Sequence, residues 1–190
     1  MRRSVIPALL AGSALLATAF ACADDSRLRR YELPNLDTLE LTLPPAWVDN
    51  VDVPPGGAPL TIQLTPADGA PFAVHLTPQA PDPTAARVMD VAALYEAVRE
   101  SAERIRPQTI EETIEIERLR GTRGAGYFFS VTDREPPPGE FRYMTQGALQ
   151  AGELVVWFTI LTNDGQEAEV ARALSMLQSL DHRGTGQDLR

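Results

Sequence analysis

One stretch constrains the fold more than any other part of the sequence. Residues 153–162 read Glu-Leu-Val-Val-Trp-Phe-Thr-Ile-Leu-Thr, so both alternating sets of side chains are largely apolar. Successive side chains of a strand point to opposite faces of a sheet, and a strand that is apolar on both faces lies inside a sheet covered on both sides. The chain must therefore supply a sheet and a cover for each of its faces.

Further apolar alternations predict the other strands. They occupy residues 36–43, 60–65, 72–76, 109–120, 126–132 and 140–150. Short turn sequences such as Ala151-Gly152 join several of these segments, which predicts hairpins and a mainly antiparallel sheet. Leu119 breaks the alternation of its segment, so we expect a bulge near Glu117–Arg118.

Two segments have the period of a helix and supply the covers. Between Thr84 and Arg106 apolar residues recur every three or four positions, which predicts an amphipathic helix with Thr84 as N-cap and Pro107 as its end. Residues 166–180 repeat the pattern. The predicted fold is α+β, an α/β/α sandwich in which two helices cover a mainly antiparallel central sheet of about six to seven strands.

The N-terminus predicts export. Two arginines precede an apolar run from Val5 to Phe20, which predicts a secretory signal peptide over residues 1–21. A retained membrane anchor is the alternative, although the run is short for a span. Residues 22–33 are expected to form a charged tether, residues 34–181 a single domain, and residues 182–190 a polar C-terminal tail.

Cys22 is the only cysteine and follows the small-x-small cleavage site Ala19-Phe20-Ala21. This arrangement resembles a bacterial lipoprotein signal, in which the cysteine becomes the lipidated first residue. The resemblance implies a lipoprotein on the periplasmic side of a bacterial membrane. The alternatives are a soluble periplasmic protein and a cysteine that is an inert part of the leader. One cysteine allows no intrachain disulfide, so packing alone must hold the domain.

Three segments, in their order along the chain, resemble segments of one fold family. They are Leu-Thr-Leu-Pro-Pro-Ala-Trp at 41–47, the apolar strand at 154–162, and the closing helical segment at 170–180. With the predicted order of strands and helices, they resemble the PsbP-like family, which includes a photosystem II extrinsic subunit, a small Ran-binding protein and many bacterial lipoproteins. The resemblance implies an α/β/α sandwich and implies no shared catalytic residues.

The sequence contains no motif for catalysis, a cofactor or a metal ion. His75 and His182 are the only histidines, whereas a catalytic zinc site needs three protein ligands. No serine stands in a Gly-x-Ser-x-Gly elbow. The Gly-rich segment 121–126 joins two predicted strands instead of leading into a helix, as a phosphate-binding loop does. We therefore predict no catalytic residue, no cofactor and no enzyme activity.

Aromatic side chains and charges near loops are the candidates for a binding surface. They are Trp47, Tyr127, Arg120, Arg123, Glu115 and Glu117. Loop residues carry binding functions disproportionately, and we expect Trp47 in a turn and the Gly-rich and proline-rich loops to converge. Core packing of the aromatic rings and a solvated acidic strand face are the alternatives.

The charge limits the partners. The chain has 17 basic and 26 acidic residues, a net charge of −9, which excludes nucleic acid because such binding needs a basic face. The sequence predicts an exported, lipid-anchored envelope protein that acts as a non-catalytic binding or accessory module. Its partner is expected to be an envelope protein or another envelope component. A periplasmic protein that binds a small ligand or ion is the alternative, with an enzyme a distant third.

Overall fold

The computed structural model describes residues 26–34, 36–54, 59–80 and 90–184. The elements in chain order are β1 (Arg27–Glu32), β2 (Thr38–Leu43), β3 (Trp47–Asp52), β4 (Thr61–Pro66), β5 (Ala73–Gln79), α1 (Val91–Ile105), a 3-10 turn (Arg106–Gln108), β6 (Glu117–Arg120), β7 (Ala125–Thr132), β8 (Tyr143–Ala151), β9 (Leu154–Thr162), α2 (Glu167–Gln178) and β10 (Asp181–Arg183).

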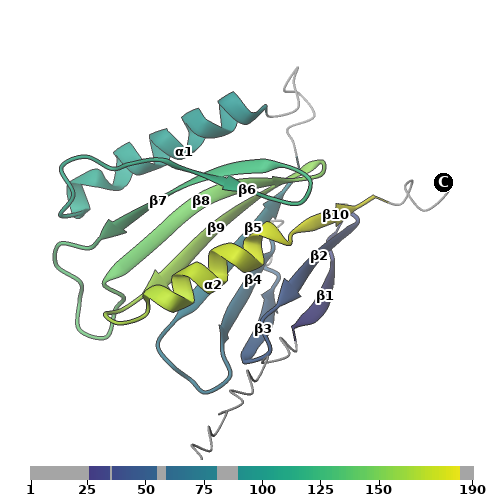
Figure 1. Ribbon diagram of the computed structural model, residues 1–190, viewed down its shortest axis with the longest axis horizontal. Helices are drawn as coiled ribbons and strands as arrows, with labels where there is room; N and C mark the ends of the chain where they lie inside the picture. The colour runs from purple at the N-terminus through teal and green to yellow at the C-terminus, as the bar shows by residue number, and fades with distance from the viewer. Residues whose placement is uncertain (1–25, 35, 55–58, 81–89, 185–190) are drawn as a thin grey trace, which may run out of the picture.

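A seven-stranded sheet forms the middle layer (Figure 1). Its strand order is β3-β4-β5-β9-β8-β7-β6, and every neighbouring pair is antiparallel. The strand β9 lies between β5 and β8 and pairs with both over most of its length. This position confirms that the two-sided apolar stretch is a central strand.

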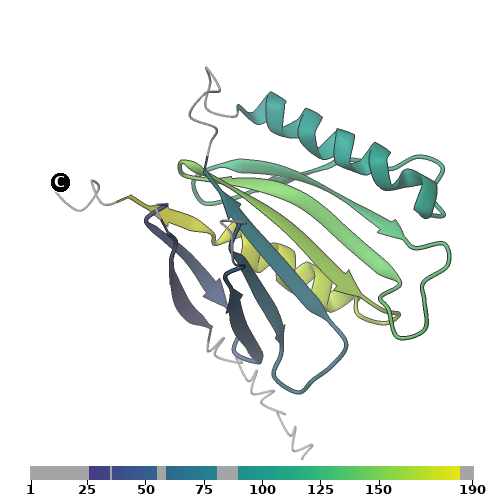
Figure 2. The ribbon, with the colours of Figure 1, turned by 180° about the vertical axis from the view of Figure 1, so that it is seen from behind.

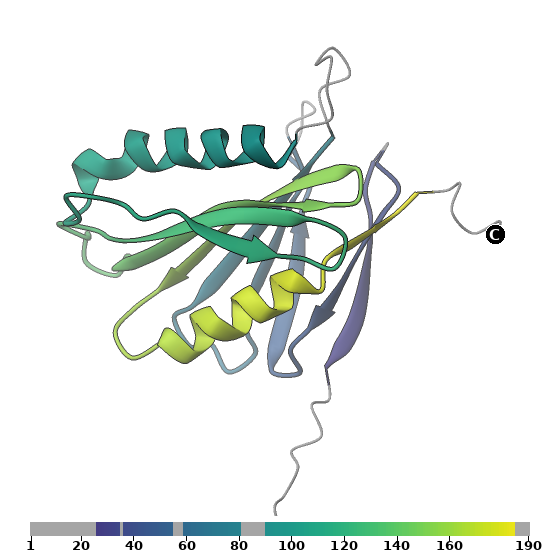
Figure 3. The same cartoon turned by 45° about the horizontal axis from the view of Figure 1, so that its top comes forward.

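The two helices lie on opposite faces of this sheet (Figure 3). Leu94 and Val98 of α1 pack against Phe129 of β7 in one buried cluster, whereas Leu177 of α2 packs with Phe158 of β9 in the other. The predicted α/β/α sandwich with a mainly antiparallel sheet is confirmed. Alternation along β7 and β9 explains why neighbouring residues of one strand belong to different clusters.

A second sheet, of order β1-β2-β10, shares the α2 face. The prediction of a tether over residues 22–33 is wrong for residues 27–32, which form β1. The charged sequence of this segment does not predict a strand. The reason is that its inner face is formed by arginines and a buried tyrosine, which bind β3. Arg29 pairs with Asp49, and the hydroxyl of Tyr31 donates to the same carboxylate at 3.1 Å.

The start of the predicted C-terminal tail also belongs to this sheet. His182 lies in β10 opposite Leu39 of β2 and is 5% exposed. Its Nε2 is 2.9 Å from the carbonyl oxygen of Leu36. Three residues are too few for a recognisable alternation, so β10 gives no strand signal in the sequence.

Two predicted strand boundaries are wrong. Trp47, expected in a turn, begins β3. The predicted strand 109–120 is reduced to β6, which pairs with β7 without a bulge. Glu111 explains part of this difference, because its carboxylate accepts the backbone N–H of Thr132 at 3.0 Å in place of a strand partner.

The first helix begins later than predicted. Asp90 is its N-cap, and the Oδ1 of Asp90 accepts the backbone N–H of Ala93 at 2.8 Å. Thr84, the predicted N-cap, lies outside the described residues. At the other end α1 stops at Ile105, just before the turn that contains Pro107, as predicted.

Removing the cap of α1 should weaken the domain. We expect Asp90→Ala to lower the free energy of unfolding by about 1 kcal/mol, the usual value of an N-cap side chain. Asp90→Asn keeps an oxygen that can accept the same hydrogen bond and should stay close to the wild type. Urea unfolding followed by circular dichroism measures both, and equal stability of all three proteins would contradict the cap.

Glu40 of β2 is held between two arginines on the outer face of the small sheet. It is 7% exposed, and its carboxylate accepts from the Nε of Arg30 at 2.7 Å and from the Nε of Arg183 at 3.1 Å. The hydrogen bond from Arg30, helped by the charge of Arg183, outweighs burial and lowers the pKa of Glu40. The carboxylate thus joins β1, β2 and β10.

This arrangement predicts a pH dependence of stability. Because the pKa of Glu40 is lower in the folded than in the unfolded chain, its contribution is complete above the unfolded value of about 4.5 and is lost as the pH falls through the folded value. Between pH 7 and pH 3, Glu40→Gln should therefore lose less stability than the wild type in urea unfolding. The variant Glu112→Gln, which removes an exposed glutamate, should follow the wild type.

Candidate binding site

The helix α1 covers only part of its face of the large sheet. It contacts β7 and β8, while β3, β4 and β5 extend away from it (Figure 2). On this face, no other helix of the described residues lies over those three strands. Except for the buried Ala73, the side chains that they present there are half-buried or exposed, so this part of the sheet is a free surface.

A continuous line of polar side chains crosses this surface. Asn50, Gln63, His75, Thr159 and Gln146 lie directly opposite one another in the register of β3, β4, β5, β9 and β8. Side chains that face each other across a ladder point to the same side of a sheet. These five residues, called the polar row, extend over about 19 Å at a strand spacing of about 4.8 Å.

One end of the polar row is tied to α1. The hydroxyl of Ser101 donates to the Oε1 of Gln146 at 3.0 Å, and the Nε2 of Gln146 donates to the Oγ1 of Thr159 at 3.3 Å. Ser101 is 8% exposed. These bonds fix the orientation of the Gln146 amide where the helix meets the sheet.

The other three members of the row have unused hydrogen-bonding groups. The side chains of Asn50, Gln63 and His75 form no hydrogen bond or ion pair with any residue that the structure describes. Burial lowers the pKa of His75 below its usual 6.5, so its imidazole is neutral at pH 7. A neutral imidazole supplies one donor and one acceptor, which makes the free part of the row an uncharged hydrogen-bonding surface.

A groove of about 440 Å³ runs between this surface and α1. Its floor includes His75, Trp157 and Thr159, and its wall on α1 includes Glu100 and Arg104. Trp157 lies opposite Thr77 of β5 and Ala148 of β8 and is half-buried. The groove thus joins an aromatic ring to the polar row.

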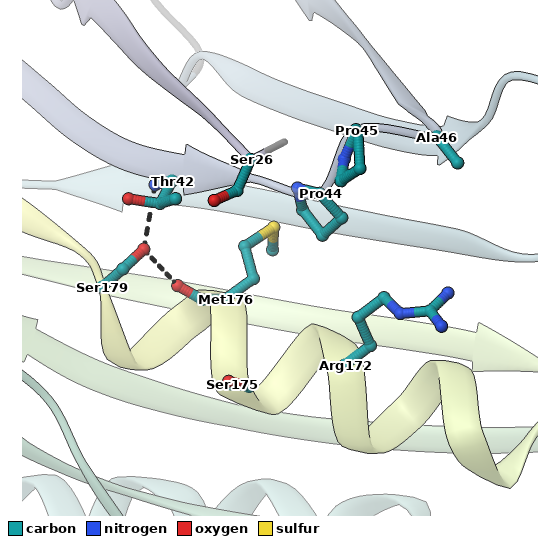
Figure 4. Close-up of a pocket in the computed structure, with 9 residues that line it drawn as sticks. All are labelled: Ser26, Thr42, Pro44, Pro45, Ala46, Arg172, Ser175, Met176 and Ser179. Carbon is teal, nitrogen blue, oxygen red and sulfur yellow. Dashed lines mark hydrogen bonds between the residues drawn. The ribbon is translucent and has the colours of Figure 1, made fainter. Parts of the chain in front are cut away.

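A second hollow lies between α2 and the small sheet (Figure 4). Its volume is about 510 Å³, and Thr42, Arg172, Met176 and Ser179 contribute to its lining. The hydroxyl of Ser179 accepts the backbone N–H of Thr42 at 2.9 Å and donates to the carbonyl of Met176 at 2.6 Å. Arg172 is bound to Glu169 at 2.8 Å. Since these polar groups already have partners, this hollow is the weaker candidate.

Five of the six residues predicted to form a binding surface lie on or next to the hairpin of β6 and β7, and Trp47 lies apart from them in β3. Trp47 is wrong as a surface residue, because it is 1% exposed and its ring lies 4.9 Å from that of Phe72 in the core. Glu117 and Arg120 belong to β6, at the opposite edge of the sheet from β3. Glu115 precedes β6 and is exposed.

The remaining two predicted residues have structural partners. The ring of Tyr127 packs edge-on against Tyr95 of α1, with centroids 5.2 Å apart. The Nε of Arg123 lies 3.2 Å from Asp181. The Gly-rich turn and the triproline loop stand at opposite ends of β7, so these loops do not converge as predicted.

The polar row is not apparent in the sequence of any single strand. The available signal was the polar half of the alternation at Thr61, Gln63 and Thr65, together with the position of His75 on the face opposite its apolar neighbours. Cys22 lies outside the described residues. None of the described helices is long and apolar enough to span a membrane.

Comparisons with known structures support the fold. No protein-family model and no curated protein matches the sequence. The solution structure of CyanoP, the cyanobacterial PsbP of Synechocystis sp. PCC 6803, matches with a TM-score of 0.51 and 13% identity over 82% of this chain and 92% of that chain. A Bacteroides thetaiotaomicron crystal structure gives a TM-score of 0.50 and 12% identity over 83% of this chain and 49% of that one. The chain therefore has the PsbP-like fold, as its sequence predicted.

Proposed function

We propose that the chain is an exported lipoprotein that acts as a non-catalytic binding module of the bacterial envelope, and that the polar row is its binding surface. The observation that carries this proposal is a set of three side chains, Asn50, Gln63 and His75, that have no hydrogen-bond partner among the described residues and lie on a sheet face beside α1. Gln63 and His75 are half-buried, and polar groups that are partly removed from water cost free energy unless they find hydrogen-bond partners. A bound partner would supply those hydrogen bonds.

The lipid anchor would keep this surface close to the membrane. Arg27, the first residue of β1, follows Cys22 by five residues, a distance of at most about 18 Å for an extended chain. The ion pair of Arg29 with Asp49 then fastens β1 to β3, which carries one end of the polar row. The anchor would thus hold the polar row at a limited distance from the membrane, where a partner in the envelope could bind it.

A small-ligand-binding protein is the second candidate. The groove beside α1, with Trp157 on its floor, has a volume within the range of small-molecule sites. A small ligand that binds there would raise the melting temperature of the protein by mass action. If the natural partner is a macromolecule, no small molecule should raise it. A thermal-shift screen of the purified chain separates the two candidates.

The lipid anchor is tested by labelling. We expect radioactive palmitate to label the wild-type protein in the producing bacterium and to leave Cys22→Ser unlabelled, because this is the only cysteine that could carry the lipid. Membrane fractionation should show the wild type with the membranes and the variant among the periplasmic proteins. Equal labelling of both proteins would contradict the anchor.

The binding surface is tested by photo-crosslinking. A benzophenone amino acid placed at Gln63, on the polar row, should yield crosslinked adducts in intact cells. The matched position is Gln178, an exposed glutamine of α2, where adducts should be absent. Adducts from Gln178 in place of Gln63, or from neither position, would contradict a role of the polar row in binding.

A further inference from the structure

We infer that the polar row binds a neutral carbohydrate chain that lies across the strands, with a sugar ring against Trp157. This inference rests on the proposed function, since it names the chemical class of partner for the same surface. It follows from the charge, the hydrogen-bonding capacity and the geometry of the row.

The row is uncharged in a chain that is rich in charge. Charged residues make up 23% of the sequence, yet the five members of the row are an asparagine, two glutamines, a threonine and a histidine that is neutral at pH 7. Amide, hydroxyl and neutral imidazole groups each offer donors and acceptors. A sugar hydroxyl also donates and accepts, so it can pair with every member of the row.

The neighbouring row adds an apolar platform and more hydroxyls. Trp157 lies next to Thr159 along β9 in the alternation of the same face, and Thr77 lies opposite the tryptophan. The hydroxyls of Thr61 and Thr77 are 3.3 Å apart. A sugar ring has an apolar C–H face and a polar rim, and a half-buried indole beside hydroxyls matches both parts.

The geometry favours a chain over a single sugar. The row extends over about 19 Å, and its free groups on β3, β4 and β5 continue beyond the groove, which ends at β5 and α1. A monosaccharide at Trp157 would leave Asn50 and Gln63 without partners. An extended neutral oligosaccharide reaches all of them.

Other classes of partner fit this surface less well. Nucleic acid needs cationic side chains, and the row has none, while the whole chain carries a net charge of −9. An apolar helix would cover the amides of Gln63 and Asn50 without pairing them, at a cost in free energy. An added peptide strand pairs with a sheet edge, whereas the row lies on a face.

The test is calorimetric titration of the full detergent-solubilised chain with three neutral tetrasaccharides: chitotetraose, cellotetraose and maltotetraose. We expect at least one to bind and to change the tryptophan fluorescence. That change should disappear in Trp157→Phe, because the only other tryptophan, Trp47, is 1% exposed. Gln63→Ala and His75→Ala should each weaken binding about threefold to tenfold, the value of one lost hydrogen bond.

The control variant is Gln178→Ala, which should bind like the wild type. Thermal unfolding of each variant shows that it is folded, and Gln63→Asn keeps an amide if Gln63→Ala is unstable. The inference is overturned if no tetrasaccharide binds, or if binding is unchanged by the variants of the row. Adducts from Gln63 in cells combined with no carbohydrate binding would overturn the inference alone and leave the proposed function standing.

Discussion

The structure depends on the burial of β9 on both faces. A strand whose neighbouring residues Val155 and Val156 are both buried needs packed side chains above and below it, and the chain provides them with α1 on one face and α2 on the other. One side chain of this size, when fully buried, contributes about 1.5–3 kcal/mol. The central position of β9 then determines that β5 and β8 flank it, and the remaining strands extend outward from these.

One helix is too narrow to cover a whole face of the seven-stranded sheet, and this explains the open surface beside α1. Seven strands span about 29 Å, whereas one helix with its side chains is about 10–12 Å wide. On the α2 face the small sheet β1-β2-β10 supplements the helix, so Ile62 and Leu64 of β4 are buried against it. On the α1 face Ile114 and Ile116 pack beside the helix, but no helix or strand of the described chain covers β3, β4 and β5. The strands farthest from α1 therefore carry Asn50, Gln63 and His75 on that side.

The elements that the sequence predicts well are those whose signal is local and apolar. β4, β5, β7, β9 and the two helices have alternation or helical periodicity within a single segment. Each is present near its predicted bounds, except that α1 begins at Val91. β1 was missed because its inner face binds β3 through arginines and Tyr31 instead of aliphatic side chains. Residues 109–116 alternate like a strand, but the carboxylate of Glu111 takes the hydrogen bond that a neighbouring strand would have made.

The polar row could not be predicted because it depends on register. Each of its residues is an ordinary outward side chain of its own strand, and only the pairing of five strands places them in a line. Pairing of β5 with β9 joins residues that are 76 to 88 positions apart in the chain, and no local pattern contains that information. The alternation of β4 and β5 did show which residues face away from the α2 side, including His75.

The outer face of the small sheet and the α1 face of β3, β4 and β5 differ in the charge of their side chains. The outer face of the small sheet carries Arg30, Glu40 and Arg183, and these charges satisfy one another. The α1 face of β3, β4 and β5 carries mainly neutral polar groups, of which the side chains of Asn50, Gln63 and His75 form no hydrogen bond with the described residues. Long charged side chains would fold over a sheet and cover it, whereas amides and hydroxyls leave its surface accessible. The contrast is one of charge and pairing: the first face holds a network of ion pairs, and the second holds the neutral side chains on which the proposed binding surface rests.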